Sequence, residues 1–422
     1  MKLSRSRLRG AVLTRKALAT VLAIGLASGA LGASSAMAAP TFSKEFAAVA
    51  GPIQPALEKA RKSKDAAAIA ELVKQVGPAM AAAKTADDKD VAGQFAYVIG
   101  SLSNDETLQR KGLQLRLEGG KVPAEMLGVV HFQLGYWAFA AKDNDLAVKE
   151  LETAIAAGYN QPQAFAILGW TYSAQGKNAE GMKALIKAID LAGPAAEQPW
   201  YGAALNAAYK LKDFPSAIDL SAKLVKAYPN KGNWHDAIAV VRDLGQLPSQ
   251  DTLDLLRLWV VTDSFGGEGD YAEFVQNADA RRNPGEVKAL LDRAVAAKAI
   301  DVSKPIFADA LRIASGRVAA DKASLPGLDK EARLPSANVA TISGAAEAFL
   351  SYGDGPKAAD LYRLALTKPG VDKSLAQTRL GIALVYAGDY AAAKAELAQV
   401  QGVRHGTALL WSTYAEQKLA GK

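Results

Sequence analysis

The strongest constraint on the fold of this chain is a pattern that recurs after 34 residues. The first copy reads His131-x2-Leu134-Gly135-x2-Ala138 and then Ala147-x3-Leu151. The second copy reads Phe165-x2-Leu168-Gly169-x2-Tyr172 and then Gly181-x3-Leu185. Small residues at helical spacing, flanked by larger apolar residues, favour two helices that approach each other closely. A fixed step of this length indicates helix-turn-helix units that stack on one another.

Three further copies follow the same pattern, starting at Tyr201, Ile342 and Gln377. Pro194 and Pro199 lengthen the connection before the first of these, so its step is 36 residues. Each copy has a predicted turn between its two helices: Lys142-Asp143-Asn144, Gly176-Lys177-Asn178, Lys212-Asp213-Phe214, Gly353-Asp354-Gly355 and Gly388-Asp389-Tyr390. Gly, Asp and Asn suit such turns because they tolerate a left-handed backbone or accept local hydrogen bonds.

This set of repeats resembles the tetratricopeptide repeat (TPR) family. The resemblance implies an all-α fold, namely a helix-turn-helix repeat solenoid that winds into a right-handed superhelix. It also implies that the first helix of each unit lines the concave face. Helical-repeat solenoids serve mostly as binding surfaces whose partner is set by surface detail, so we expect a non-catalytic scaffold or adaptor.

We divide the chain at changes in periodicity and composition. Pro326, Gly327 and Pro335 lie among charged and small residues where no apolar period survives, which favours a linker or long loop. Gly77-Pro78 is likewise read as a break between two helices. The predicted segments are a signal peptide (1–38), an N-terminal helical region of degenerate repeats (39–126), a TPR array (127–232), degenerate helical repeats (233–320), the linker or long loop (321–338), and a C-terminal TPR pair with a capping helix (339–422).

The N-terminus has the features of an export signal. Six cations precede an apolar run over residues 17–33, and Ala36-Met37-Ala38 provides a small-residue cleavage site. The prediction is a cleaved signal peptide and a periplasmic or secreted protein of a Gram-negative-type envelope. The alternative is an uncleaved anchor helix, although several glycines weaken the run and it is short for a span. No other segment is expected to cross a membrane.

Charge gives little support for a nucleic-acid partner. The 50 Lys and Arg against 43 Asp and Glu include the six leader cations, so the exported chain carries 44 against 43. We therefore expect neither nucleic acid nor an anionic membrane as partner. The chain has no cysteine, so disulfides are excluded and stability rests on packing.

No catalytic motif or cofactor site is recognisable, and we predict no cofactor, no metal and no enzymatic activity. His131, His235 and His405 each stand alone, without a His-Glu-x-x-His pattern. The glycines of Gly266-Gly267-Glu268-Gly269 lack the Lys-Ser/Thr that completes a phosphate loop. An enzyme whose site is assembled from sequence-distant residues remains an alternative, which requires paired carboxylates or a histidine in a cleft.

The predicted binding residues follow from the resemblance. If Leu134, Gly135 and Ala138 pack against the neighbouring helix, the remaining stripe of each first helix faces the groove. That stripe gives the partner-binding candidates Phe132, Tyr136, Phe139, Trp170, Asn206 and Tyr209. Aromatic side chains in a groove suit a protein or peptide segment, such as an envelope protein. The alternatives are packing in the core and, for the rings, stacking on a glycan.

The corresponding stripe of the C-terminal pair is more aliphatic. It comprises Ser343, Glu347, Leu350, Leu375, Thr378, Ile382 and Val385. We expect this stripe to pack on the preceding body or on another copy of the chain. The last helix, from Thr407 to Lys418, is expected to cover the end of the stack with Trp411 and Tyr414 pointing into it.

Overall fold

A computed structural model describes residues 40–245 and 247–421, and these form α-helices joined by short turns, without a strand. The all-α prediction is therefore confirmed. The predicted signal peptide lies outside the described residues. The chain divides into two compact units: unit 1 ends at Leu191 and unit 2 begins at Ala192. Each unit is described by itself.

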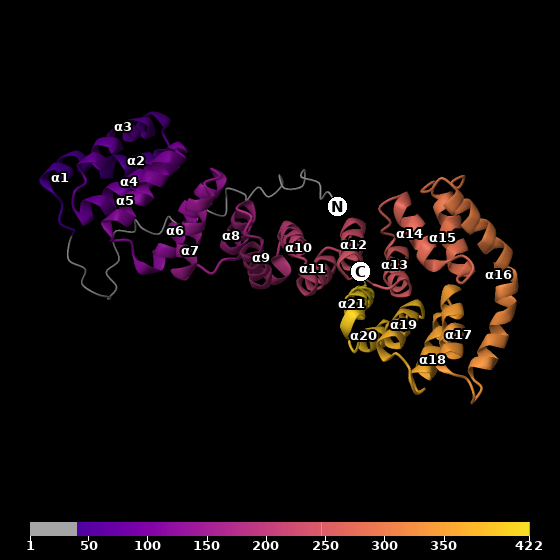
Figure 1. The fold of residues 1–422 in the computed structure, drawn as a ribbon. Helices are drawn as coiled ribbons and strands as arrows, with labels where there is room; N and C mark the ends of the chain where they lie inside the picture. Colours follow the sequence, from indigo (N-terminus) through magenta and orange to yellow (C-terminus); the bar gives the residue numbers. More distant parts are fainter. Residues whose placement is uncertain (1–39, 246, 422) are drawn as a thin grey trace. The chain divides into compact units, whose positions relative to one another are not determined.

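Unit 1 contains an N-terminal helical group and then two helix pairs. Its helices are α1 (Lys44–Ala50), α2 (Ile53–Ser63), α3 (Ala66–Ala82), α4 (Ala86–Ser103), α5 (Glu106–Gly119), α6 (Ala124–Ala140), α7 (Asn144–Ala156), α8 (Pro162–Ala174) and α9 (Asn178–Ala192). Consecutive helices pack in antiparallel pairs, α4 with α5 and α6 with α7, and α7 then packs on α8 (Figure 1). Three hydrophobic clusters, centred on α1–α4, α5–α6 and α6–α8, form the core.

Unit 2 contains the remaining helices. They are α10 (Gln198–Leu211), α11 (Phe214–Ala227), α12 (Lys231–Gly245), α13 (Ser249–Thr262), α14 (Glu268–Ala278), α15 (Pro284–Ala296), α16 (Pro305–Ala332), α17 (Val339–Ser351), α18 (Gly355–Leu366), α19 (Lys373–Tyr386), α20 (Tyr390–Leu397) and α21 (His405–Leu419). Short 3-10 turns, η3 (Gly193–Ala195) and η4 (Gly402–Arg404), precede α10 and α21.

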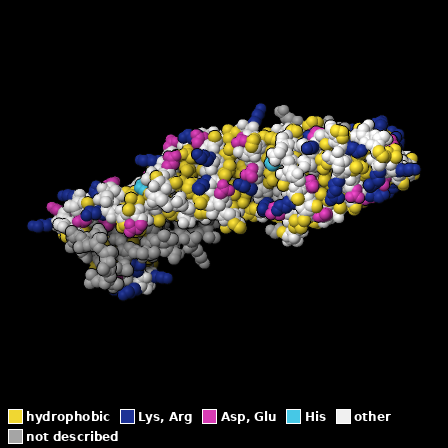
Figure 2. All heavy atoms as spheres, turned by 90° about the horizontal axis from the view of Figure 1, so that it is seen from below, with side chains coloured by type: hydrophobic (Ala, Val, Ile, Leu, Met, Phe, Trp, Pro, Cys, Tyr) yellow, Lys and Arg dark blue, Asp and Glu magenta, His cyan; other side chains and the backbone are white. Residues whose placement is uncertain are grey.

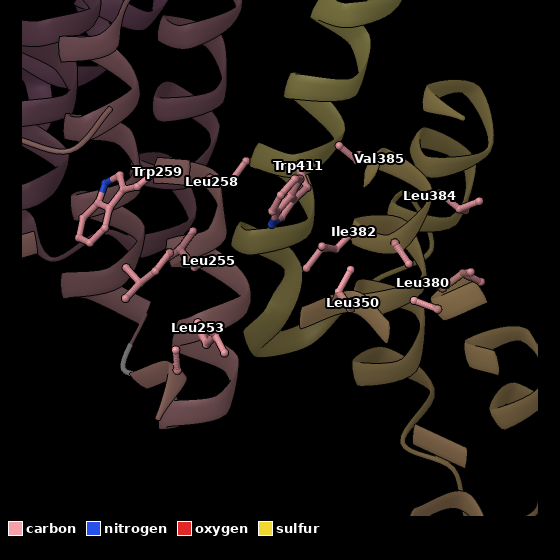
Figure 3. Packing of buried hydrophobic residues seen from close by; sticks show 14 of the residues in the cluster. Leu253, Leu255, Leu258, Trp259, Leu350, Leu380, Ile382, Leu384, Val385 and Trp411 are labelled. Atoms are coloured by element: carbon pink, nitrogen blue, oxygen red, sulfur yellow. The ribbon is translucent and has the colours of Figure 1, made fainter. Parts of the chain in front are cut away.

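The helices of unit 2 close into a ring. Each helix from α11 to α20 packs on the next, and α21 packs both on α20 and back on α11, α12 and α13 (Figure 1). Trp411 of α21 lies between Leu258 of α13 and Ile382 of α19 (Figure 3). One continuous hydrophobic cluster fills the ring. The last helix thus does more than cover the end of the stack, because it joins that end to the beginning of the unit.

The predicted turns between paired helices are confirmed. An aspartate caps the second helix of four pairs by accepting a hydrogen bond from the backbone N–H three residues later: Asp143, Asp213, Asp354 and Asp389. The residue before each of these caps has a left-handed backbone, with φ of 63° at Lys142, 55° at Lys212, 75° at Gly353 and 78° at Gly388. The turn therefore has one geometry across both units.

Two predicted breaks are wrong, and both involve proline. Residues 321–332 were expected in a linker or loop, but they continue α16, which runs through Pro326. Gly77-Pro78 lies inside α3 in the same way. A proline removes one backbone hydrogen bond from a helix. The helix continues where its flanking turns are held by packing, as Leu325 and Leu328 are held against the core of unit 2.

The predicted TPR array over 127–232 also differs from the observed division. Its first two pairs, α6–α7 and α8–α9, belong to unit 1, whereas the third pair, α10–α11, belongs to unit 2. The lengthened connection with Pro194 forms η3 at this boundary. The packing of α11 on α12 and α21 assigns the third pair to the ring.

Candidate functional site

Three of the predicted binding residues form a partly exposed aromatic face on unit 1. Tyr136 and Phe139 lie on α6, and Trp170 lies on α8. The rings of Phe139 and Trp170 stack with centroids 6.3 Å apart and planes at 22°. All three side chains are partly buried and pack against the hydrophobic cluster between α6 and α8. These three residues are called the aromatic face below.

Trp170 carries a polar group that its surroundings do not satisfy. Its indole Nε1 is covered and has no hydrogen-bond partner among the described residues. A covered donor without an acceptor costs free energy, on the order of 1–3 kcal/mol.

Phe132 lies in the core. It is 4% exposed and stacks on Tyr159, with ring centroids 4.6 Å apart and planes at 24°. Gly128 makes this approach feasible, since a Cβ atom at residue 128 would lie 3.0 Å from the Cβ of Tyr159. Of the two interpretations open for Phe132, packing or groove, its position in the structure corresponds to packing.

Asn206 and Tyr209 lie on α10 and are partly exposed. They belong to unit 2, whereas the other four predicted residues belong to unit 1. The six residues therefore do not form one face within a unit.

Tyr97 of α4 is a partly buried aromatic residue that sequence reasoning missed. It packs on the hydrophobic cluster of Leu113, Val130 and Trp137, which Tyr136 also contacts. Burial raises the pKa of the Tyr97 phenol. The α4–α5 pair has no legible repeat pattern, so no register assigned Tyr97 to a stripe. The close approach of Gly93 to Gly112, where an added Cβ would lie 2.5 Å from the carbonyl oxygen, is the signal that identifies this pair.

A cluster of buried charged side chains lies within the ring of unit 2. Arg257 of α13 is 0% exposed, and its guanidinium donates to Asp254 at 2.9 Å on the same helix. It also donates to both carboxylate oxygens of Glu286 on α15, at 2.8 and 2.9 Å, and to Glu347 on α17 at 2.5 Å. Arg379 of α19 donates to Asp254 at 2.9 Å.

The surroundings shift the pKa values of these carboxyl groups in opposite directions. Burial raises the pKa of Asp254 and that of Glu286. Burial also acts to raise the pKa of Glu347, but Arg257 and Arg379 outweigh it and bring that pKa to about 2. Tyr362 adds a hydrogen bond to Glu347 at 2.9 Å. These five charged residues, Asp254, Arg257, Glu286, Glu347 and Arg379, are called the charge cluster below.

Four further residues of the C-terminal stripe are buried in the ring, whereas Ser343 and Leu375 are partly buried. Leu350, Thr378, Ile382 and Val385 are all inaccessible to solvent or nearly so. The stripe therefore packs on its own unit through α13 and α21. We expected this stripe to pack on the preceding body or on another copy of the chain. In the structure α19 packs on α13, which precedes it, and on α21, which follows it, all within unit 2.

The same packing contact recurs in pairs that are far apart in the sequence. In each of these pairs, a Cβ atom added to the glycine of the first helix would lie too close to Cγ of a leucine on the second helix. The distance is 2.8 Å for Gly135 and Leu151, 2.6 Å for Gly169 and Leu185, and 2.4 Å for Gly381 and Leu397. The glycine on the first helix and the leucine on the second are 16 residues apart in all three pairs. The chain has a tetratricopeptide-like repeat fold.

The comparisons with known proteins give no closer assignment. No protein-family model and no curated protein sequence matches the chain. Among solved structures, a tetratricopeptide repeat protein from Parabacteroides merdae ATCC 43184 matches at 13% identity over 61% of this chain and 99% of its own, with a TM-score of 0.28. The structure of Naa15/Naa10 bound to HypK-THB matches at 12% identity over 89% of this chain and 65% of its own, with a TM-score of 0.37.

The TPR-like repeats do bring carboxylates together from distant parts of the sequence, as the enzyme alternative required. In the charge cluster, however, the carboxylate oxygens accept hydrogen bonds from two guanidinium groups and a phenol. A general acid or base must reach a proton of its substrate. Carboxylates that are held in this way inside a packed core serve structure, and nothing in their geometry supports catalysis.

His235 of α12 is the histidine with the most polar surroundings. It lies 3.4 Å from Asp236 and 3.2 Å from Asp270 of α14, and its ring stacks on Trp259. The hydrogen bonds that His235 donates to Asp236 and to Asp270 raise its pKa to about 9, although burial acts to lower it. The imidazole is thus protonated at neutral pH, which makes it a poor general base.

Other classes of site receive no support from the described residues. No group of three or more His, Asp or Glu side chains in the described ranges is arranged to hold a metal ion. None of the described helices is both long and apolar enough to cross a membrane. Basic and acidic side chains are interspersed on the face that Figure 2 shows, without a broad patch of one sign.

Proposed function

We propose that this protein is a non-catalytic scaffold that binds a protein or peptide segment on the aromatic face of unit 1. The observation that carries the proposal is the stacked pair of Phe139 and Trp170. These two rings come from the first helices of neighbouring repeats and remain partly exposed, whereas Phe132, two turns before Phe139 on α6, is buried. A stripe that only filled the core would be buried along its whole length.

The chemistry of the aromatic face suits a peptide. Aromatic rings bury a large apolar area at low entropic cost, and they form the centres of many binding interfaces. Tyr136 adds a hydroxyl group to this face. We place this function in the cell envelope, on the basis of the N-terminal sequence features typical of an export signal.

A pull-down from the envelope fraction tests the proposal. The bait is the chain without its predicted signal peptide, beside a Phe139→Ala, Trp170→Ala variant. The matched control is Tyr172→Ala, because Tyr172 is a partly buried aromatic residue of α8 that hydrogen-bonds Glu152 and lies two residues from Trp170. Circular dichroism and thermal melting establish that all three baits are folded.

The proposal predicts that defined proteins are captured by the parent and by the Tyr172 variant and are lost from the double variant. Capture of the same proteins by all three baits would refute it. A parallel arm with cell-wall glycans and exopolysaccharide tests the glycan alternative, since the rings of Tyr136 and Trp170 also suit sugar stacking. Loss of glycan binding in the double variant, without protein capture by the parent, would favour that alternative.

A further inference from the structure

An open pocket lies between α1 and α4 of unit 1. Its volume is about 380 Å³, within the range of roughly 300–1,000 Å³ that ligand pockets in proteins usually occupy. Three aromatic rings, one valine and small residues in and directly after α1 form most of its lining, and two side-chain amides complete it. The larger lining residues are Phe42, Phe46, Val91, Phe95, Gln54 and Gln94. None of the lining side chains is ionisable, so the pocket presents apolar surface and two neutral amides.

Helix α1 is held in place beside α4, so the pocket is preformed. The backbone N–H of Thr41 donates to Asp87 at 2.8 Å. The backbone N–H and the hydroxyl of Ser43 donate to Asp88 at 3.1 and 2.8 Å. Phe46 is 1% exposed and packs α1 into the core of unit 1. A preformed pocket binds a ligand without the entropic cost of ordering its walls.

The pocket lies on the stripe of α4 that is equivalent to the aromatic face of α6 and α8. A Cβ atom added at Gly93 of α4 would lie 2.6 Å from Cγ of Arg116 on α5. Gly93 is therefore the counterpart of Gly135 and Gly169. The residues that directly follow these three glycines are Gln94, Tyr136 and Trp170. The first of them lines the pocket, and the other two belong to the aromatic face.

Tyr97 joins the pocket to the aromatic face. It lies one turn after Gln94 on α4 and occupies the position that Phe139 has on α6. Tyr97 and Tyr136 both pack on the hydrophobic cluster between α5 and α6. Tyr136 also packs with Phe139 and Trp170 on the next cluster. A row of partly buried aromatic side chains thus leads from α8 over α6 to the pocket beside α4.

Phe42 leaves apolar surface exposed at this pocket. Its ring lies against that of Phe46, with centroids 5.6 Å apart and planes at 54°, and 39% of the residue is exposed. A single exposed apolar side chain is ordinary on a protein surface. Here it lines an apolar pocket that continues a row of partly exposed rings, and aromatic residues around a pocket are typical of the centre of a binding interface.

We propose that this pocket is an anchor subsite of the binding surface of unit 1, which takes one large apolar side chain of the segment that lies on the aromatic face. The inference rests on the function proposed for the aromatic face. A lining without charge favours leucine or phenylalanine over lysine or glutamate, because a charged group there would lose water without gaining a partner. The row of aromatic side chains assigns the occupant to the same bound segment, since a segment that crosses α8 and α6 reaches α4 next.

Two tryptophan substitutions on α1 separate a filled pocket from an altered surface. Ala47 lines the pocket, so Ala47→Trp fills it. Ala48 is the next residue, is exposed and does not line the pocket, so Ala48→Trp is the matched control. Ala47→Met replaces Ala47→Trp if the tryptophan variant does not melt like the parent. The Phe139→Ala, Trp170→Ala variant reports on the aromatic face separately.

The probe is a display library of random dodecapeptides, selected on the chain without its predicted signal peptide, and fluorescence anisotropy then measures the binding of synthesised peptides. The proposal predicts that selected peptides share a large apolar residue at one position. Ala47→Trp should weaken their binding about tenfold or more, and Ala48→Trp should not. Replacing the shared apolar residue of the peptide by serine should weaken binding to the parent by a similar factor and binding to Ala47→Trp little, because the side chain and the pocket no longer meet there.

The outcomes distinguish the anchor subsite from the proposed function. Peptides that depend on Phe139 and Trp170 but bind Ala47→Trp as tightly as the parent would overturn the anchor subsite and leave the proposed function standing. Peptides that bind the Phe139→Ala, Trp170→Ala variant as tightly as the parent would contradict the proposed function, and the shared segment with it. A charged residue at the shared position would overturn the apolar occupant.

If the selection yields no peptide, saturation-transfer NMR with N-acetyl-leucinamide and N-acetyl-lysinamide decides. Saturation transfer to the leucine derivative that Ala47→Trp removes and Ala48→Trp retains supports the pocket. The absence of transfer, equal transfer to both derivatives, or transfer that survives Ala47→Trp overturns it.

Discussion

Arg379 on α19 donates a hydrogen bond from Nε to Oδ2 of Asp254 on α13 at 2.9 Å, across 125 residues of sequence. Trp411 of α21 donates a hydrogen bond from its indole nitrogen to the backbone carbonyl oxygen of the same Asp254 at 2.8 Å. Asp254 is thus the residue at which the late helices of unit 2 join the early ones.

Replacing Arg379 tests this dependence. Removing one partner of a buried ion pair leaves the other charge uncompensated, so we expect Arg379→Met to lower the free energy of unfolding of unit 2 by about 3–5 kcal/mol. Denaturant unfolding monitored by tryptophan fluorescence measures the change. The control is Arg312→Met, since Arg312 pairs with Asp309 at the surface with 72% of its side chain exposed. That substitution should change stability by less than about 0.5 kcal/mol, and an equal effect of both variants would contradict the role of the cluster.

Because paired helices contact each other closely at a glycine and a leucine, we expect substitutions at these two positions to have coupled effects on stability. In the third repeat the larger side chain is on the first helix and the smaller one on the second, because Leu205 and Ser221 occupy the positions of Gly169 and Leu185. Gly169→Leu alone should destabilise unit 1 by roughly 1–3 kcal/mol or more, since even a Cβ would lie 2.6 Å from Leu185. Adding Leu185→Ser should restore part of that loss. A double-mutant cycle in denaturant measures the coupling, and strictly additive effects would show that the two positions do not share one space.

The shared turn geometry predicts opposite effects of glycine and alanine. Lys142 adopts a φ of 63° without the freedom of glycine, so Lys142→Gly should leave stability unchanged or raise it by up to about 1 kcal/mol. Gly353 has a φ of 75°, and Gly353→Ala should lower stability by about 1 kcal/mol. Thermal melting of the two variants beside the parent gives the comparison. A melting temperature that rises for Gly353→Ala would be inconsistent with the turn as described.

The raised pKa of His235 predicts that the protein loses stability in alkaline solution. Its pKa is raised to about 9 from an ordinary value of 6.5, so its contribution is complete below the ordinary value and disappears as the pH rises through about 9. Because the side chain is 30% exposed, solvent screening limits the contribution to the order of 1 kcal/mol. The urea midpoint of the parent should fall between pH values on either side of about 9, and that of His235→Gln should fall less. Parallel decreases in both proteins would assign the effect to other groups.

The local rules of the repeat were readable from the sequence, and the closure of unit 2 was not. Gly135, Gly169 and Gly381 predict close helix pairs because only a residue without a side chain fits opposite a leucine at that distance. The turns between paired helices were likewise predicted from the Asp and Gly residues at those positions. These features involve residues that are near one another in the chain, so their spacing carries the information.

The charge cluster joins residues from four helices that no spacing connects. Glu347 was predicted on a stripe of the C-terminal pair, but its partners Arg257 and Arg379 lie on different helices. A single sequence contains no record of which distant residues meet. Pro326 and Pro78 illustrate the opposite error, since a local rule for breaking helices was outweighed by packing.

For the candidate site, the sequence predicted which residues form the stripe but not how deeply each one is buried. Phe132 and Phe139 are equivalent in the pattern, yet Phe132 stacks on Tyr159 in the core and Phe139 stacks on Trp170 near the surface. The difference depends on Gly128, which allows the chain at Tyr159 to approach α6. Burial of this kind depends on tertiary contacts.

The most direct test of the binding face is photocrosslinking in the native host. A photoreactive phenylalanine analogue replaces Phe139 in the full chain, and Tyr172 on α8 serves as the control position. The account predicts that the analogue at residue 139 crosslinks to a defined partner protein, that the control position does not, and that Trp170→Ala abolishes the crosslink. Equal crosslinking from both positions, or a crosslink that survives the loss of Trp170, would contradict the assignment of the aromatic face as the binding site.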